Sequence, residues 1–412
     1  MELYYSLSIL IVLASIFSYL NIRYLKLPSS IGVMLIAMLS SVALVILGNT
    51  YPSLLNNFSE LLRDLDFTQL LMGAMLNFLL FAGGVSINFS DLKEQKVPVM
   101  VFSTVSVVIS TFAVGALLYY ILPYFSVDLP LIYCLLFGAL ISPTDPVAVL
   151  GALKAAKVPK ALETKVAGES LFNDGVAVVV FVVILQLANG SETEISFERI
   201  SMLFLREAVG GILIGVLLGI AAARALKKID DYKVSVLITL SVVMGGHLLA
   251  RSLGISSPLT MVAAGLVLGT FGKYTDHMSA LTKDYLEKFW DLTDEILNAI
   301  LFLLIGFEIL LIPSVLDFWV AGVITIVVVL LARFLSIYIP ARTVPFKEKF
   351  DMATIKILVW GGLRGGVSIA LALSINEGPY KQMIISITYF VVVFSILVQG
   401  LTIGKMAKRL LP

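Results

Sequence analysis

Two aspartates lie inside long apolar runs of this 412-residue chain, where an ionised side chain is costly. Asp145 falls within one run and Asp174 within the next, and Arg364 lies at the centre of another run much later in the chain. Charged groups held at membrane depth usually mark a path for ions or protons. These three residues therefore predict a polar transport site, with a structural network of ion pairs as the alternative interpretation.

Asp174 belongs to a segment that is dense in polar groups. Ser170, Asn173 and Asp174 stand at positions i, i+3 and i+4, which places them on one face of a helix. A hydroxyl, an amide oxygen and a carboxylate are hard oxygen ligands suited to a small alkali cation such as Na⁺. Thr144 and Asp145 can add a second hydroxyl and a second carboxylate. We predict that these five residues form a cation- and proton-binding site.

We expect the other ionisable residues in the apolar runs to have structural roles. We expect Glu169 and Arg364 to form a structural ion pair, because either charge alone in an apolar environment would be unfavourable. In the alternative interpretation, Arg364 repels cations from the site directly. Glu308 and Arg333 lie toward the ends of their apolar runs and are expected to reach the membrane interface. His247 is expected to be a packing or interfacial histidine.

The composition predicts the class of protein. Hydrophobic residues make up 59% of the chain and charged residues 14%, whereas soluble domains contain about 25% charged residues. No basic block suggests a nucleic-acid partner. The single Cys134 excludes a disulfide framework, and two histidines, His247 and His277, are too few for most histidine metal sites. We predict no cofactor beyond the transported ions, and lipid as the surrounding medium.

The apolar runs predict an all-α polytopic membrane protein with about thirteen transmembrane helices, since a span needs about 20 residues. The predicted spans are residues 3–22, 28–48, 68–87, 98–123, 128–154, 163–190, 204–226, 233–252, 257–273, 290–311, 315–340, 351–377 and 381–404. Residues 51–67 and 274–289 are expected to be amphipathic or interfacial connectors.

The distribution of basic residues predicts the orientation. Of the 29 Lys and Arg, 22 lie in the loops that follow odd-numbered spans or at the span edges beside them, and five lie in or beside the loops that follow even-numbered spans, while Arg333 and Arg364 lie deeper inside spans. Loops rich in Lys and Arg stay in the cytoplasm. The N-terminus is therefore predicted outside the cell and the C-terminus inside.

Two predicted spans are interrupted. The fifth contains Ser142-Pro143-Thr144-Asp145-Pro146, and the twelfth contains Gly361-Gly362-Leu363-Arg364-Gly365-Gly366. Prolines remove backbone donors, and glycines weaken a helix. Paired breaks in corresponding spans mark the binding site of transporters built from inverted repeats. We therefore predict inverted repeats formed by spans 1–6 and 8–13, with two broken, crossing helices at spans 5 and 12.

With these motifs in place, the chain resembles the NhaP-type Na⁺/H⁺ antiporters of the monovalent cation/proton antiporter-1 family, relatives of the eukaryotic Na⁺/H⁺ exchangers. The resemblance rests on the following motifs: Thr144-Asp145-Pro146, Gly168-Glu169-Ser170-Leu171-Phe172-Asn173-Asp174-Gly175 and Gly362-Leu363-Arg364-Gly365-Gly366. It implies that Asp174 binds the cation and the proton, that Thr144, Ser170 and Asp145 contribute ligands, and that Asn173 braces the site. It also implies a structural Glu169–Arg364 pair.

The resemblance implies an architecture as well: one transmembrane antiporter domain over residues 1–412, assembled as a homodimer in the inner membrane of a prokaryote. The dimerisation part would comprise residues 1–90 and 233–311, and the core transport part 98–190 and 315–412, joined by the linker span 204–226. The core would move against the dimerisation part in an elevator-like motion. The chain departs from some relatives at two places: Leu80-Phe81-Ala82-Gly83-Gly84 lacks an acidic residue, and Asn298-Ala299-Ile300 lacks an arginine.

These features predict a secondary transporter that exchanges Na⁺, or Li⁺, for H⁺ because cation and proton compete for Asp174. An Asn173-Asp174 pair offers one titratable group, so we predict an electroneutral exchange of one for one. K⁺/H⁺ exchange by the same fold is the first alternative. An intramembrane aspartyl protease is a second, although the Gly-x-Gly-Asp pattern of such enzymes is absent around both aspartates. We expect the chain not to be an enzyme.

Overall fold

The structure is a computed structural model that describes residues 2–48, 50–63, 67–87, 89–189, 197–274, 279–312 and 315–411. Every regular element within these ranges is a helix, which confirms the all-α prediction. His277 lies outside the described residues. The first fourteen elements are α1 (Glu2–Leu20), η1 (Asn21–Leu25), α2 (Ser29–Gly48), α3 (Pro52–Arg63), α4 (Phe67–Leu70), η2 (Leu71–Met75), α5 (Leu76–Ser86), α6 (Phe89–Glu94), α7 (Lys96–Ser103), α8 (Val105–Ile121), η3 (Leu122–Phe125), α9 (Leu131–Ile141), α10 (Val147–Ala155) and α11 (Lys160–Ala188).

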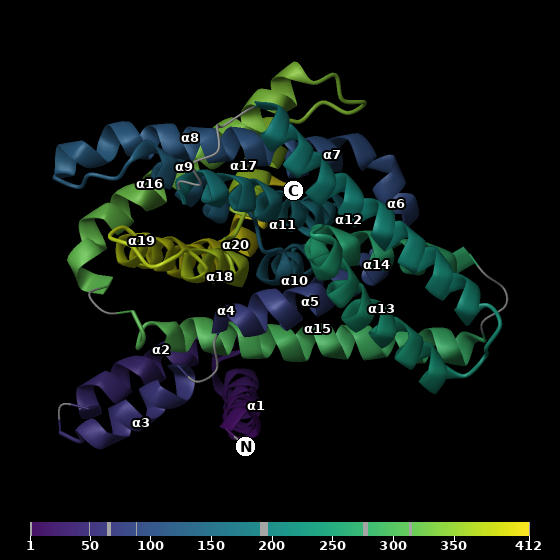
Figure 1. Ribbon diagram of the computed structural model, residues 1–412, viewed down its shortest axis with the longest axis horizontal. Coiled ribbons are helices and arrows are strands. Elements are labelled where there is room, and N and C mark those ends of the chain that lie inside the picture. The colour runs from purple at the N-terminus through teal and green to yellow at the C-terminus, as the bar shows by residue number, and fades with distance from the viewer. Residues whose placement is uncertain are drawn as a thin grey trace.

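The second half of the chain is helical in the same way. Its elements are α12 (Phe197–Leu226), α13 (Tyr232–Leu253), α14 (Ser257–Tyr274), α15 (Ala280–Glu308), η4 (Val315–Phe318), α16 (Trp319–Thr343), α17 (Met352–Trp360), α18 (Gly366–Leu373), α19 (Lys381–Phe394), η5 (Ser395–Gln399) and α20 (Gly400–Leu410). Figure 1 shows α15 running unbroken along one side of the molecule, with α1 viewed nearly end-on beside it.

Nine helical segments among the described residues are long and apolar enough to cross a membrane. The other four predicted spans coincide with α9–α10, α14, α15 and α17–α18. The segments α9–α10 and α17–α18 are interrupted, and α15 carries charged residues along its first half. Length and composition alone therefore do not identify these three as membrane spans. The protein is therefore a polytopic helical membrane protein, and the count of thirteen stays a prediction.

Both predicted helix breaks are confirmed. α9 ends at Ile141 and α10 begins at Val147, so the segment with two prolines is non-helical. α17 ends at Trp360 and α18 begins at Gly366, so the glycine-rich segment is non-helical as well. Each break falls where the sequence removes backbone donors or lowers helix propensity. The inverted-repeat relationship between the two halves remains a prediction.

The boundary of α15 corrects one prediction. Residues 274–289 were expected to form a connector, but α15 begins at Ala280. The helix starts there because the side chain of Ser279 accepts a hydrogen bond from the amide of Thr282, which caps the first turn. Asp230, in the loop between α12 and α13, accepts further hydrogen bonds from the side chains of Ser279 and Thr282 at 2.9 and 2.8 Å. The loop is thereby anchored to the start of α15.

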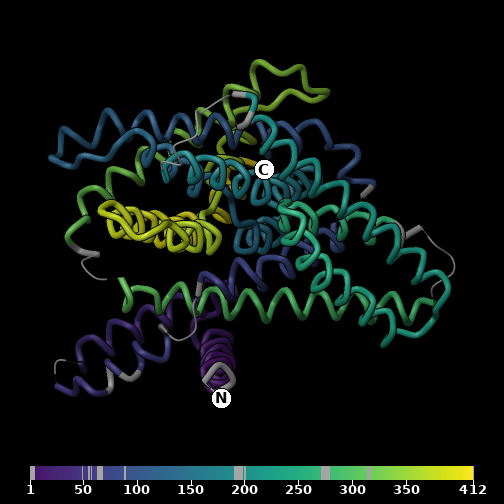
Figure 2. The backbone as a smooth tube through the Cα atoms, viewed as in Figure 1, coloured from purple at the N-terminus to yellow at the C-terminus, as the bar shows by residue number. Residues whose placement is uncertain are grey.

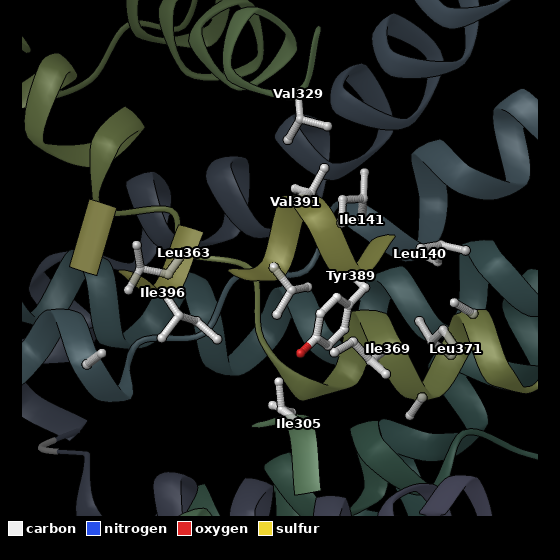
Figure 3. Packing of buried hydrophobic residues seen from close by; sticks show 14 of the residues in the cluster. Leu140, Ile141, Ile305, Val329, Leu363, Ile369, Leu371, Tyr389, Val391 and Ile396 are labelled. Atoms are coloured by element: carbon white, nitrogen blue, oxygen red, sulfur yellow. The ribbon is translucent and has the colours of Figure 1, made fainter. Parts of the chain in front are cut away.

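Packing of apolar side chains brings the two breaks into the interior. The larger buried cluster includes Ile141 at the end of α9 and Leu363 in the second break. Figure 3 shows these residues with Ile369 of α18 and Val391 of α19 around the same region. In Figure 2 the yellow helices near the end of the chain lie above the long green helix that Figure 1 labels α15, and the N-terminus lies below it. α9 contacts both α11 and α18, so three helical segments converge at the breaks.

Candidate cation and proton site

The two breaks are hydrogen-bonded to each other through their unwound backbone. The amide of Asp145 donates to the carbonyl oxygen of Leu363 at 2.8 Å. The guanidinium of Arg364 donates to the carbonyl oxygens of Ser142 and Pro143 at 2.5 and 3.1 Å. Backbone that leaves a helix within a membrane needs such partners, because lipid supplies none. Arg364 thus holds the first break in shape and is itself only 2% exposed.

A hydroxyl and amide cluster joins the first break to α11. The hydroxyls of Thr144 and Ser170 lie 3.0 Å apart. The side-chain amide of Asn173 donates to the Thr144 hydroxyl at 2.7 Å, and its oxygen accepts from the Thr144 backbone amide at 3.3 Å. All three residues are buried. Asn173 therefore fixes the position of Thr144 with both ends of its amide, which leaves the two hydroxyls as candidate cation ligands.

The two aspartates lie next to this cluster and are half-buried. Asp145 accepts a hydrogen bond from the amide of Val147 at 2.9 Å, which orients its carboxylate at the start of α10. Asp174 follows Asn173 on α11, and its negative charge interacts electrostatically with that of Asp145. We find no hydrogen bond to the Asp174 carboxylate from the described residues. The carboxylate is thus free to take a cation or a proton.

The predicted ion pair between Glu169 and Arg364 is wrong. Glu169 instead pairs with Arg333 of α16, with Oε1 and Nη1 2.5 Å apart and both side chains at most 6% exposed. Arg333 also donates to the carbonyl oxygen of Leu358, near the end of α17. The expectation that Arg333 reaches the membrane interface is wrong for the same reason. Arg364 instead donates through Nη1 to the two carbonyls of the first break.

Two other expectations are tested by the structure. Glu308 is 5% exposed, so the prediction that it reaches the membrane interface is wrong. His247 is held by polar contacts of its Nδ1 with the side chains of Asn77 and Ser257, at 3.1 and 2.9 Å. Ser257 in turn donates to Asn77 at 2.8 Å, which closes a polar cluster linking α13, α14 and α5. This cluster supports the expectation of a packing histidine.

Asp294 of α15 is a charged residue near the site that the sequence analysis missed. It is half-buried, and it interacts electrostatically with Asp145 across the boundary between α15 and the broken helix. Leu301, two turns later on the same helical face, is in contact with Gly366, where a Cβ would lie 3.0 Å from the leucine Cγ. The i, i+4 spacing of Asp294 and Asn298 within an apolar run was the signal available in the sequence.

The donor set suits a monovalent cation better than a transition metal. Among the described residues, no group of three or more His, Cys, Asp or Glu side chains converges as a metal site would require. The site offers two carboxylates, from Asp145 and Asp174, and two hydroxyls, from Thr144 and Ser170, together with unwound backbone. Oxygen ligands of this kind suit hard cations. The same carboxylates accept protons, so one site has the chemistry for both ions.

Comparison with known proteins agrees with this chemistry. Residues 10–409 match the family described as sodium/hydrogen exchanger, transmembrane. The Na⁺/H⁺ antiporter NhaP of Pseudomonas aeruginosa is 45% identical over 405 residues, covering 97% of this chain and 95% of that protein. The Na⁺/H⁺ antiporter NhaH of Halobacillus dabanensis is 32% identical over 410 residues, covering 98% and 97%.

The fold is similar to a solved structure as well. The sodium proton antiporter MjNhaP1 of Methanocaldococcus jannaschii superposes with a TM-score of 0.80 at 21% identity, covering 100% of this chain and 99% of that one. The family match spans nearly the whole chain and includes both helix breaks. The chain belongs to the sodium/hydrogen exchanger family.

Proposed function

We propose that the protein exchanges Na⁺ for H⁺ across the membrane, with Asp174 as the shared binding group. The observation that carries the proposal is the half-buried Asp174 carboxylate, placed beside the hydroxyls of Thr144 and Ser170 at a broken helix. Deprotonated Asp174 attracts Na⁺, and protonation cancels the charge that holds the cation. An unpaired carboxylate is unfavourable in a site that excludes water. The site therefore changes its access from one face of the membrane to the other only with a cation or a proton bound to Asp174.

The names of the relatives favour Na⁺ as the substrate. NhaP and NhaH, which cover nearly all of this chain, are both Na⁺/H⁺ antiporters. We propose an electroneutral exchange of one Na⁺ for one H⁺, since Asn173 occupies the position where a second acidic group would otherwise titrate. Li⁺ and K⁺ are the rival cations, because oxygen ligands alone do not fix the size of the ion.

We further propose two parts that move relative to each other, a dimerisation part (1–90 and 233–311) and a core (98–190 and 315–412). Packing supports this division: α15 contacts α2 and α5, and α14 contacts α5, whereas α9 contacts α8 and α11. The proposal includes a homodimer, an N-terminus outside the cell, a C-terminus in the cytoplasm and a location in the inner membrane of a prokaryote. Close helix contacts at glycines, such as Gly84 of α5 against Gly265 of α14, stabilise the dimerisation part.

The test is exchange by the purified protein in proteoliposomes with an imposed pH gradient. Na⁺ should dissipate the gradient in the wild type, and Asp174→Asn should abolish this exchange. Asp145→Asn should leave a weakened remnant, and Asp128→Asn, at an exposed position, should match the wild type. Persisting exchange in Asp174→Asn contradicts the proposal. Parallel runs with Li⁺ and K⁺ rank the cations, and strong dependence on an imposed membrane voltage contradicts the one-for-one stoichiometry.

A further inference from the structure

The C-terminal end of α15 buries a carboxyl group that the transport site does not use. Glu308 is the last residue of this 29-residue helix and is 5% exposed. We find no hydrogen bond or ion pair to its side chain from the described part of the chain. The C-terminal end of a helix carries partial negative charge, so a carboxylate there is repelled. An ionised Glu308 is therefore unfavourable in this conformation both through burial and through its position on the helix.

The polar group near Glu308 is the hydroxyl of Tyr389 on α19. Tyr389 is 3% exposed, and its hydroxyl has no hydrogen-bond partner among the described residues. Figure 3 shows this hydroxyl directed from α19 toward Ile305, which precedes Glu308 by one turn of α15. Glu308 and Tyr389 also interact electrostatically. A buried hydroxyl without a partner is unfavourable too. Two unsatisfied polar groups, one from each proposed moving part, thus lie near each other.

Among the described side chains, the helices that contact α15 place no positive charge at Glu308. α2, α5 and α18 all contact α15, and none of them contains an ionisable side chain. On α19, Lys381 is paired with Glu377 at 2.7 Å. Lys381 also stands eight residues before Tyr389, which is about 12 Å along the helix.

The other elements near α15 do not change this conclusion. In η4, Asp317 is exposed and carries the same sign of charge as Glu308. The described tyrosines of α1, Tyr5 and Tyr19, are exposed. α13 meets α15 far from Glu308, where Trp290 donates to Thr239. The ionisable residues of α13 are Tyr232, Lys233, His247 and Arg251. α3 packs against α15 through the rings of Phe58 and Phe307, and its described ionisable side chain, Glu60, is exposed and carries the same sign of charge as Glu308. Among the described side chains, none is therefore placed to neutralise Glu308 in this conformation.

We propose that Glu308, with Tyr389 beside it, is a second proton-binding site. It controls whether the core moves away from the C-terminal end of α15. The inference rests on the proposed movement of the core against α15. Protonated Glu308 is compatible with the closed arrangement seen here. Deprotonated Glu308 favours an arrangement in which the core has moved and water reaches the carboxylate. Loss of the Glu308 proton thereby favours movement of the core away from α15. This effect is separate from the binding of cation and proton at Asp174.

The test isolates this step from competition at Asp174. The full-length protein in proteoliposomes is given saturating Na⁺ on both sides, and radiolabelled Na⁺ self-exchange is measured while the pH is varied on one face at a time. The wild-type rate should rise with pH on the face where α15 ends. Glu308→Gln is neutral at every pH, so it should lose this rise and stay at the rate of the acidic wild type. The control is Glu377→Gln, whose side chain is 87% exposed at the same end, and it should keep the wild-type profile.

A wild-type pH profile in Glu308→Gln overturns the proposal. If that variant fails to fold, Tyr389→Phe provides the test, because it removes a partnerless hydroxyl and so stabilises the closed arrangement. It should slow self-exchange at alkaline pH, and an unchanged rate there overturns the proposal. Failure of the proposed function is a different result: Na⁺ self-exchange that survives in Asp174→Asn.

Discussion

The backbone amide of Asp145 donates a hydrogen bond to the carbonyl oxygen of Leu363 at 2.8 Å. This bond connects the unwound segment after α9 with the unwound segment after α17. Each segment supplies a partner that the other needs, since lipid offers none. The position of the Asp145 carboxylate therefore depends on the shape of the glycine-rich break as well as on its own helix.

Gly365→Ala tests that dependence. A Cβ at residue 365 would lie 2.5 Å from Oδ2 and 2.7 Å from Cβ of Asp145, so the aspartate must move. We expect the KM for Na⁺ to rise roughly tenfold, which corresponds to about 1.4 kcal/mol. The measurement is Na⁺-dependent dissipation of a pH gradient in proteoliposomes. Gly151→Ala is the matched control, because no atom lies within 4 Å of its added Cβ. Equal KM values for the two variants would contradict the argument.

Arg333→Met should destabilise the protein by about 3–5 kcal/mol, because it leaves the buried Glu169 carboxylate unpaired. The double variant Glu169→Gln/Arg333→Met removes both charges and should recover much of the stability. Thermal unfolding in detergent measures both. Arg342→Met, at an exposed position on the same helix, is the control and should unfold like the wild type. A double variant no more stable than Arg333→Met would show that the pair is not the source of the loss.

Asp294→Asn should raise the KM for Na⁺ a few-fold and leave kcat unchanged. Asp294 interacts with Asp145 through partly hydrated surroundings, where charges contribute on the order of 1 kcal/mol. Its role would be to attract the cation toward the site. Initial rates over a range of Na⁺ concentrations separate the two parameters. Glu295→Gln removes the same charge from an exposed position one residue later and should have no effect. A fall in kcat instead would indicate a structural role.

Asp230 should contribute stability at neutral pH that is lost in acid. Hydrogen bonds from Thr282 and Ser279 hold the pKa of its carboxyl below its ordinary range. A lowered folded-state pKa gives stability that is present above the unfolded-state value and is lost as the pH falls through the folded-state value. The window therefore lies below about pH 4. Asp230→Asn should flatten the pH dependence of the melting temperature there, while the transport profile near neutral pH stays that of the wild type. A shifted transport profile would contradict this assignment.

Local patterns in the sequence predict much of the fold and the site. Helical periodicity places Ser170 and Asn173 on one face, and the prolines around Thr144 predict the break that brings its hydroxyl to Ser170. The Glu169 partner could not be found in this way. Pairing depends on which helix lies next to α11 and how it is rotated, and position along an apolar run suggests only that Arg333 is near an interface. Asp294 was missed because its position in the predicted span 290–311 does not show that this helix lies next to the broken helix.

The pairing of Glu169 with Arg333 has a consequence for the valence of the transported ion. Around the two helix breaks, the three carboxylates of Asp145, Glu169 and Asp174 are balanced by the two guanidiniums of Arg333 and Arg364, which leaves one formal negative charge. A single Na⁺ or a single proton makes the assembly neutral, and a divalent ion would leave it positive. Burial penalises any residual charge. We therefore expect this polar centre to favour a monovalent ion over Ca²⁺ or Mg²⁺ in the transported state.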